Sequence, residues 1–188
     1  MKILLLRHGK PKLENFGNIK SGQLQAWIEA YNESGIDESH NPSIDVIEEV
    51  AKCNYIVCSH LRRSIESAHA LNVHDVHMTD LEFREMELPY SSNLPFKLSP
   101  MIWVSLFRMA WFLGYAKNCE PFKNEKQRAR FCARKLINLA NEYGSVAFIG
   151  HGLFNKYIVK ELLANNWQGP SGPGTKYWSY AIYKGNTS

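Results

Sequence analysis

The sequence predicts an α/β fold built on a doubly wound, parallel sheet. Three short runs lead to this prediction, at residues 3–6, 55–58 and 145–149, and each is almost wholly apolar. Consecutive apolar positions are typical of a central parallel strand, which is buried on both faces. Each run stops at polar or glycine-bearing sequence. Parallel sheets place functional residues just past the carboxyl ends of their strands, so these three endings are where a site is expected.

Helical patterns occupy much of the sequence between these strands. Residues 23–33 carry Leu24, Trp27, Ile28 and Tyr31 at the spacing of one helix face. We expect four further helices: one from Pro42 onward, with Ile44, Ile47 and Val50 or Ala51 as its apolar face, and others over residues 60–71, 123–143 and 153–165. The helix at 123–143 is expected to end at Gly144 and to turn Lys123, Lys126, Arg128, Arg130 and Arg134 mostly to solvent.

Two strands are less clearly marked, at residues 76–78 and at 177–183, where we expect the edge of the sheet. The segment 101–115 is apolar nearly all round, with Trp103, Phe107 and Trp111 four residues apart. It is too short to cross a membrane and contains Arg108, so it predicts a buried or interface helix. A hydrophobic cap over a substrate cleft is the alternative interpretation.

The composition is that of an ordinary globular protein. The chain has 188 residues, which suits one domain, with 45% hydrophobic and 21% charged residues and a net charge of +4. That charge is compatible with a small anionic substrate and too weak to indicate nucleic acid. No export signal is visible, so we expect a cytoplasmic protein with free thiols at Cys53, Cys58, Cys119 and Cys132. We interpret His74 and His77 as surface residues rather than a metal site, because no third ligand is evident.

Basic residues follow the three predicted strands. Arg7 and His8 follow the first, Arg63 lies in the first helical turn after the second, and His151 follows the third. Because the carboxyl ends of parallel strands meet at one edge, we expect these side chains to converge, whereas Arg62 is interpreted as solvated. Two histidines and two arginines around a helix N-terminus form an oxyanion pocket suited to a phosphoryl group. His8 is placed as the nucleophile, and Arg7 helps to keep its imidazole neutral.

The chain resembles the histidine phosphatase superfamily, whose members have the phosphoglycerate mutase-like fold. Residues 5–9 match its first strand, which ends in Arg-His-Gly. Residues 59–63 match the Ser-x-x-x-Arg pattern after the second strand, and this selects Arg63 over Arg62. Residues 148–152 match the later strand that ends in His-Gly. The resemblance implies a three-layer fold, with helices on both faces of a mixed, mainly parallel sheet.

The resemblance also implies a two-step reaction that needs neither metal nor cofactor. His8 attacks the phosphorus and forms a phosphohistidine, while Arg7, Arg63, His151 and the amide of Gly152 hold the phosphoryl group. The expected product is free phosphate, released from a phosphomonoester or a phosphohistidine. Two alternatives stay open: a phosphoglycerate-type mutase, and a catalytically silent phosphate-binding protein.

The general acid is less well marked than the other site residues. The family places it in a Leu-x-Glu triplet after the third strand, to which Phe83-Arg-Glu85 is the nearest counterpart, with Glu82 as the competitor. We expect Glu85 to protonate the leaving oxygen and then to activate water. The family's glycines and Trp-Glu-Gly are replaced here by residues 86–89, and Lys10 stands where an acidic residue is common.

The resemblance covers the ends of the chain better than its middle. We expect a single domain over residues 1–188, with a family-divergent insert near residues 90–124 in which specificity would lie. The expected partner is a phosphorylated small molecule or a phosphoprotein, and no membrane span or nucleic acid is implied. Whether the chain forms a homodimer is left open.

Overall fold

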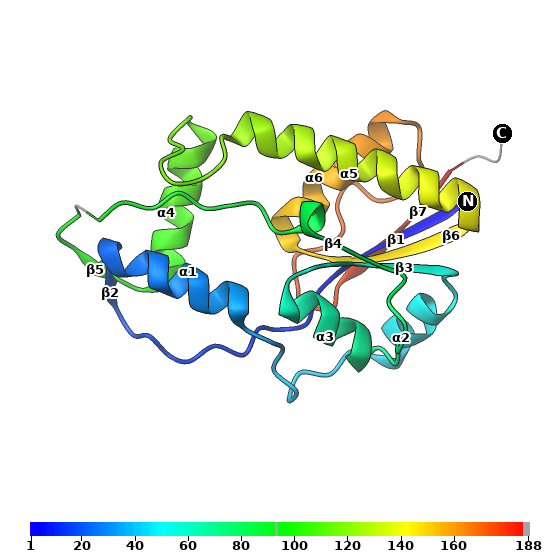
Figure 1. Cartoon of the computed structure of the whole chain (residues 1–188), viewed down its shortest axis with the longest axis horizontal. Helices are drawn as coiled ribbons and strands as arrows, with labels where there is room; N and C mark the ends of the chain where they lie inside the picture. Colours follow the sequence, from blue (N-terminus) through cyan, green and yellow to red (C-terminus); the bar gives the residue numbers. More distant parts are fainter. Residues whose placement is uncertain (93, 186–188) are drawn as a thin grey trace.

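The computed structural model describes residues 1–92 and 94–185 and has a five-stranded sheet at its centre (Figure 1). Its strands are β1 (Lys2–Arg7), β3 (Tyr55–Ser59), β4 (Met78–Asp80), β6 (Ser145–Gly150) and β7 (Tyr180–Lys184). Their order across the sheet is β4-β3-β6-β1-β7. The first four run parallel to one another, and β7 runs antiparallel to β1 at the edge. The sheet is mixed and mainly parallel, so the predicted fold class is confirmed.

The strand register brings three strand endings level with one another. Arg7 at the end of β1 lies opposite Gly150 of β6, and Cys58 of β3 lies opposite Ile149 of β6. The residues that follow these strands therefore emerge side by side at one edge of the sheet. This is the convergence that the three apolar runs predicted.

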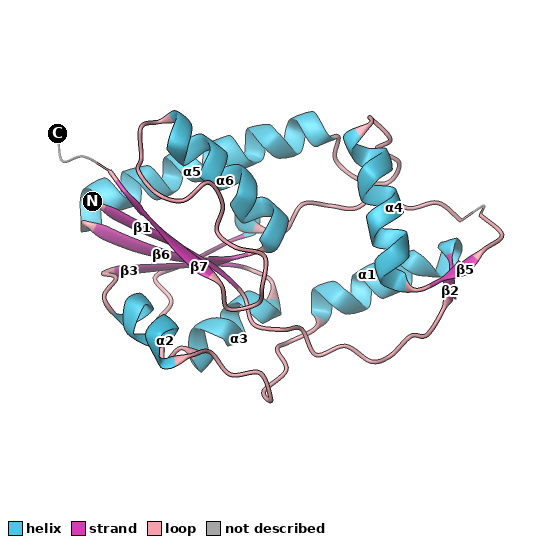
Figure 2. Ribbon diagram, turned by 180° about the vertical axis from the view of Figure 1, so that it is seen from behind, coloured by secondary structure: helices cyan, strands magenta, loops and turns pink. Residues whose placement is uncertain are grey.

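Helices cover both faces of the sheet, which makes the three predicted layers (Figure 2). α5 (Phe122–Tyr143) and α6 (Gly152–Ala164) lie on one face, and α2 (Ile44–Ala51) and α3 (Arg62–Ala70) lie on the other. Alternate residues of β1 point to opposite faces, so Ile3 and Leu5 join the core under α5 and α6 whereas Leu4 and Leu6 join the core under α2 and α3.

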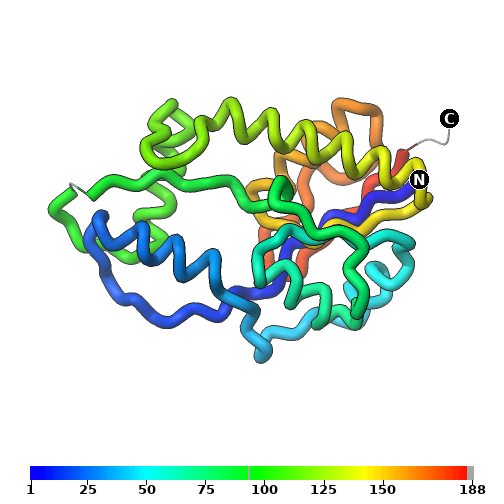
Figure 3. Tube along the Cα trace, viewed as in Figure 1, coloured from blue at the N-terminus to red at the C-terminus, as the bar shows by residue number. Residues whose placement is uncertain are grey.

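A second, smaller body extends from the sheet and has its own apolar cluster. It contains β2 (Ile19–Lys20) paired with β5 (Lys97–Leu98), together with α1 (Leu24–Glu33) and α4 (Pro100–Phe112), and we call residues 19–33 and 97–112 the lobe. The cluster comprises Ile19, Leu24, Trp27, Trp103 and Phe107 of the lobe, together with Leu88 from the segment that leads to β5. Figure 3 shows these two distant stretches of sequence side by side at the end of the molecule far from both termini.

Three predicted elements differ in detail from the structure. The third strand is Met78–Asp80, slightly later than residues 76–78. The last strand begins at Tyr180, because Trp178 has a φ of 63° and cannot continue an extended strand. In α2 the prediction that Ile44 faces inward is wrong: Val46 and Val50 are buried and Ile44 is 75% exposed. The face that includes Ile44 and the face that includes Val46 both fit a helical period. Packing against the sheet decides that the face with Val46 is buried.

The apolar segment at 101–115 forms α4, which is buried on one side only. Trp103, Phe107 and Trp111 are buried as predicted, whereas Ile102, Leu106 and Met109 are exposed. Within the described part of the chain, no helix combines the length and apolarity that a membrane span requires. The prediction of one domain with an insert near residues 90–124 stays a prediction, although β5 and α4 fall inside that range.

The core under α5 and α6 should be the most sensitive to truncation. Phe148 is fully buried and packs against Phe83 with ring centroids 4.7 Å apart. We expect Phe148→Ala to lower the free energy of unfolding by about 3–5 kcal/mol, because it removes buried apolar surface and leaves a cavity. Urea denaturation measures this change. Phe131→Ala is the control, since Phe131 is 58% exposed and should change stability by about 0.5 kcal/mol or less.

Candidate active site

His8 lies just past β1 and is only 1% exposed. Its Nδ1 lies 2.7 Å from the carbonyl oxygen of Gly9, so Nδ1 carries the proton and Nε2 keeps its lone pair. Burial is the main cause that lowers the pKa of His8 to about 3, and the charge of Arg63 adds to it. The imidazole is therefore neutral at ordinary pH, and its basic lone pair is at Nε2, where it accepts a hydrogen bond from Nε of Arg63.

Three buried donors around His8 have no hydrogen-bond partner among the described residues. They are Nε of Arg7, Nη2 of Arg63 and Nδ1 of His151. Nε of Arg63 donates a hydrogen bond to Nε2 of His8 at 3.3 Å, and the ring centroids of His8 and His151 are 5.1 Å apart. Buried donors are normally paired, so three unpaired ones beside one neutral imidazole are an arrangement that can bind an anion with several oxygens.

The proton on His151 is directed into this pocket by Ser59. The Ser59 hydroxyl lies 2.7 Å from Nε2 of His151 and accepts the backbone N–H of Leu61. The hydroxyl can then donate to Nε2, which leaves the imidazole proton on Nδ1, facing the pocket. Burial lowers the pKa of His151 well below its usual value, so this ring is also neutral. His151 is the residue before α6, and its position at the helix N-terminus favours an anion.

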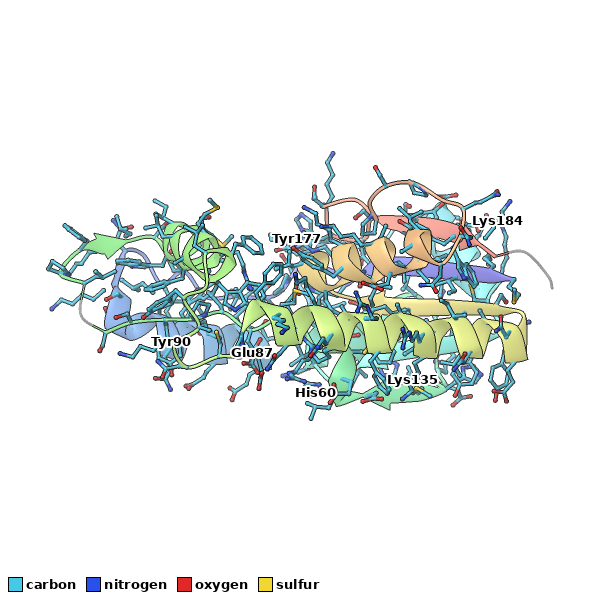
Figure 4. The ribbon with its side chains drawn as sticks, turned by 90° about the horizontal axis from the view of Figure 1, so that it is seen from above. His60, Glu87, Tyr90, Lys135, Tyr177 and Lys184 are labelled. Atoms are coloured by element: carbon cyan, nitrogen blue, oxygen red, sulfur yellow. The ribbon has the colours of Figure 1, made fainter. Side chains whose placement is uncertain are left out.

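Two aromatic rings hold the arginines in place. The guanidinium of Arg7 lies 4.3 Å from the ring centre of Tyr177 and donates to the carbonyl of Thr175. The guanidinium of Arg63 lies 4.6 Å from the ring centre of Tyr31 and donates to the carbonyl of Tyr31 at 2.9 Å. Figure 4 shows Tyr177 at the junction between the sheet and the lobe. The sequence analysis did not identify either tyrosine as a site residue. It placed Tyr31 only on the apolar face of a helix.

Glu85 lies beside the same pocket and is anchored to α6. Its carboxylate accepts the backbone N–H of Phe154 at 2.9 Å and that of Leu153 at 3.3 Å. Together with Arg7, Arg63 and Gly152, it lines a cleft of about 820 Å³. Glu82 is not among the residues that line this cleft. Of the two competing carboxylates, the structure therefore brings Glu85 to the site.

The segment that carries Glu85 is held by two arginines from different helices. Arg128 of α5 donates to the carbonyls of Glu82, Arg84 and Glu85, and its guanidinium lies over the ring of Phe154. Arg108 of α4 donates to the carbonyls of Met86 and Glu87. These bonds fix the stretch in which the sequence departs from the family pattern.

The prediction that Arg128 faces solvent is wrong. Its side chain is 8% exposed, because it pairs with the buried carboxylate of Glu125 one turn earlier. The Glu125–Arg128 spacing of i and i+3 was the available signal. By contrast, Arg62 is solvated as predicted and pairs with Glu66 on its own helix, with Nε and Oε1 2.6 Å apart.

Other predicted features lie away from this site. Lys10 pairs with Asp37 at 3.2 Å, and His74 and His77 are exposed. Cys53, Cys58, Cys119 and Cys132 are free, as predicted. Among the described residues, no group of three or more His, Cys, Asp or Glu side chains is arranged to hold a metal ion.

No family model and no curated protein sequence matches the chain. Solved structures do match over 96% of it. A mycobacterial glucosyl-3-phosphoglycerate phosphatase has a TM-score of 0.62 at 21% identity, with 88% of that chain covered. YhfR of Bacillus stearothermophilus has a TM-score of 0.60 at 16% identity, with 89% covered. A phosphoserine phosphatase variant of Entamoeba histolytica bound to phosphoserine has 0.56 at 14%, with 89% covered.

The chain has the phosphoglycerate mutase-like fold of these structures. At these identities the likeness concerns the fold, and the chemistry rests on the residues of the site. This fold brings Arg7, His8, Arg63 and His151 together at the strand endings, which is where the sequence predicted them.

The buried histidine gives folding stability a pH dependence that can be measured. The unfolded chain binds a proton at His8 near pH 6.5, whereas the folded chain does so only near pH 3. Stability contributed by neutral His8 is therefore present above pH 6.5 and falls as the pH drops toward 3, by about 1.4 kcal/mol per pH unit. Urea denaturation at several pH values between about 6.5 and 4 should give a shallower slope for His8→Gln than for wild type. His69→Gln, at an exposed position on α3, should keep the wild-type slope.

Proposed function

We propose that this protein is a metal-independent phosphatase that hydrolyses a phosphomonoester or a phosphohistidine through a phosphohistidine intermediate on His8. The observation that carries the proposal is the arrangement of three unpaired, buried donors around a neutral imidazole. Nε of Arg7, Nη2 of Arg63 and Nδ1 of His151 suit the three equatorial oxygens of a phosphoryl group. The backbone amide of Gly152, at the start of α6, adds a fourth donor.

In the first step, Nε2 of His8 bonds to phosphorus as the ester P–O bond breaks. The leaving oxygen takes a proton from the carboxyl group of Glu85, which lines the same cleft. The ring now carries phosphorus on Nε2 and a proton on Nδ1. The hydrogen bond from Nδ1 to the Gly9 carbonyl supports the positive charge that this places on the ring.

In the second step, water attacks the phosphorus and the P–N bond breaks. The Glu85 carboxylate takes the proton from this water, and His8 returns to its neutral form while phosphate leaves. Glu85 suits both steps because its carboxylate is fixed by the N–H groups of Leu153 and Phe154. Arg128 and Arg108 fix the backbone around it.

The comparisons agree with this reaction class. Two of the similar structures are, by name, a glucosyl-3-phosphoglycerate phosphatase and a phosphoserine phosphatase, and both names describe hydrolysis of a phosphomonoester. A mutase would use the same phosphohistidine but would need a bisphosphate primer. A silent phosphate-binding protein would bind phosphate and release none.

We also propose the setting in which the protein works. The four free cysteines support a reducing compartment, and therefore the cytoplasm. The net charge of +4 supports a small phosphorylated substrate or a phosphoprotein rather than nucleic acid. The exposed apolar side of α4, at Ile102, Leu106 and Met109, is the surface through which a homodimer would form. Sedimentation analysis distinguishes monomer from dimer.

The direct test is hydrolysis of p-nitrophenyl phosphate in the presence of a chelator. We expect His8→Ala to reduce turnover by about 10³-fold or more, because it removes the nucleophile. His69→Ala should keep wild-type turnover. If chelator abolishes wild-type activity, or if His8→Ala retains it, the phosphohistidine route is wrong. Phosphate binding without turnover of this substrate or of a panel of phosphometabolites would favour the silent alternative, and turnover that requires a bisphosphate primer would favour a mutase.

The role of Glu85 can be tested through the leaving group. We expect Glu85→Gln to slow phosphate esters of alkyl alcohols by about 10²–10⁴-fold, because these need a proton on the leaving oxygen. p-Nitrophenyl phosphate, with a good leaving group, should lose much less in its first step. Glu82→Gln is the matched control and should leave both rates unchanged. An equal loss with both kinds of ester in Glu85→Gln would contradict the general-acid role.

A further inference from the structure

The cleft beside the phosphoryl pocket has an apolar wall between α1 and α4, and polar side chains such as Asn32, His60 and Asn118 line other parts of it. It is formed between the sheet and the lobe, has a volume of about 820 Å³, and so has room for a leaving group well beyond a few carbon atoms. α1 contributes Trp27 and Ile28, and α4 contributes Met101 and Val104. Met86, Leu88 and Leu153 complete the apolar wall. One edge of α4, within the apolar segment 101–115, therefore lines the cleft.

Most charged groups in the cleft wall are already engaged within the chain. Arg108 donates to the carbonyls of Met86 and Glu87 and lies 4.6 Å from the ring centre of Trp111. Nη2 of Arg84 lies 3.6 Å from Oε1 of Glu87, with which it forms an ion pair. These cations are therefore poorly available for a second phosphate or a carboxylate on the substrate. Lys156 also lines the cleft, on an exposed turn of α6 at the surface.

A polar leaving group would fit badly against the part of the wall formed by α1 and α4. Hydroxyl or carboxylate groups pressed against Trp27, Ile28 and Val104 would lose water without gaining hydrogen bonds, at a cost in free energy. An apolar or aromatic leaving group would instead gain from burial. The names of two similar structures describe polar leaving groups, serine and glucosylglycerate, so the lobe of this chain points to a different substrate.

We propose that the substrate is the monophosphate ester of a largely apolar alcohol or phenol, with its hydrocarbon part held between α1 and α4. The proposal rests on the phosphatase function proposed above and adds the class of leaving group. The phosphoryl group is held at the strand endings and the hydrocarbon part by the lobe. Selectivity therefore comes from the apolar area that the leaving group buries.

A homologous series of substrates measures this selectivity. In ethyl, butyl and hexyl phosphate the leaving oxygen is chemically alike, and only the buried apolar area grows. We expect kcat/KM to rise about fourfold for each added CH₂ until the cleft is filled. 3-Phosphoglycerate and glycerol phosphate should be poorer substrates than butyl phosphate.

Two methionines on α4 provide a matched pair of variants. Met101 lines the cleft and is 63% exposed, whereas Met109 is 62% exposed and is not among the residues that line it. Replacement by glutamine keeps the length of the side chain and makes it polar. Met101→Gln should lower the ratio of kcat/KM for hexyl over ethyl phosphate by about fivefold or more, and Met109→Gln should keep the wild-type ratio.

The outcomes separate this inference from the function on which it rests. If p-nitrophenyl phosphate is hydrolysed in a His8-dependent way but the alkyl series is flat, or 3-phosphoglycerate is preferred, only the apolar leaving group is overturned. If both methionine variants change the ratio equally, the assignment of the cleft wall is overturned. If wild type releases no phosphate from any of these esters, the phosphatase function itself fails.

Discussion

A guanidinium buried beside an imidazole is the constraint on which the site depends. Arg63 is fully buried with its Nε 3.3 Å from His8, and the charge of Arg63 makes a proton on Nε2 unfavourable. Among the described residues, Arg63 donates to neutral groups only, namely Nε2 of His8 and the carbonyls of Tyr31 and Asn32, and it lies against the ring of Tyr31. A buried cation held only by dipoles attracts an anion strongly. The same charge therefore keeps His8 neutral and, in the proposed reaction, draws the phosphoryl group toward it.

Much of this arrangement could be read from sequence because it is local to strand endings. The runs before Arg7, Ser59 and Gly150 mark parallel strands, and the rule that parallel strands end at one edge brings their next residues together. Tyr31 and Tyr177 could not be predicted as site residues. They meet the arginines only through the path of the loops and α1, and no periodic pattern encodes such long-range contacts.

The segment that carries Glu82 and Glu85 shows where comparison with a family motif no longer identifies a single residue. Its sequence lacks the glycines and Trp-Glu-Gly usual in the histidine phosphatase superfamily, so the motif leaves both Glu82 and Glu85 as candidates for the general acid. The structure holds the segment by backbone carbonyls, to which Arg128 and Arg108 donate. Every residue has a backbone carbonyl, so the sequence of the segment does not reveal that its carbonyls accept these hydrogen bonds. The residues that hold it, Arg108 and Arg128, lie 20 or more residues away in the sequence, on α4 and α5.

The lobe has a hydrophobic cluster separate from the two that flank the sheet. Substitutions in it can therefore reshape recognition without loosening the strands that carry His8 and His151. In the laboratory, the lobe is the part to diversify or exchange for new activities. Tyr31 and Arg108 should be kept in such variants. Tyr31 contacts the guanidinium of Arg63, and Arg108 donates to the carbonyl of Met86, next to Glu85.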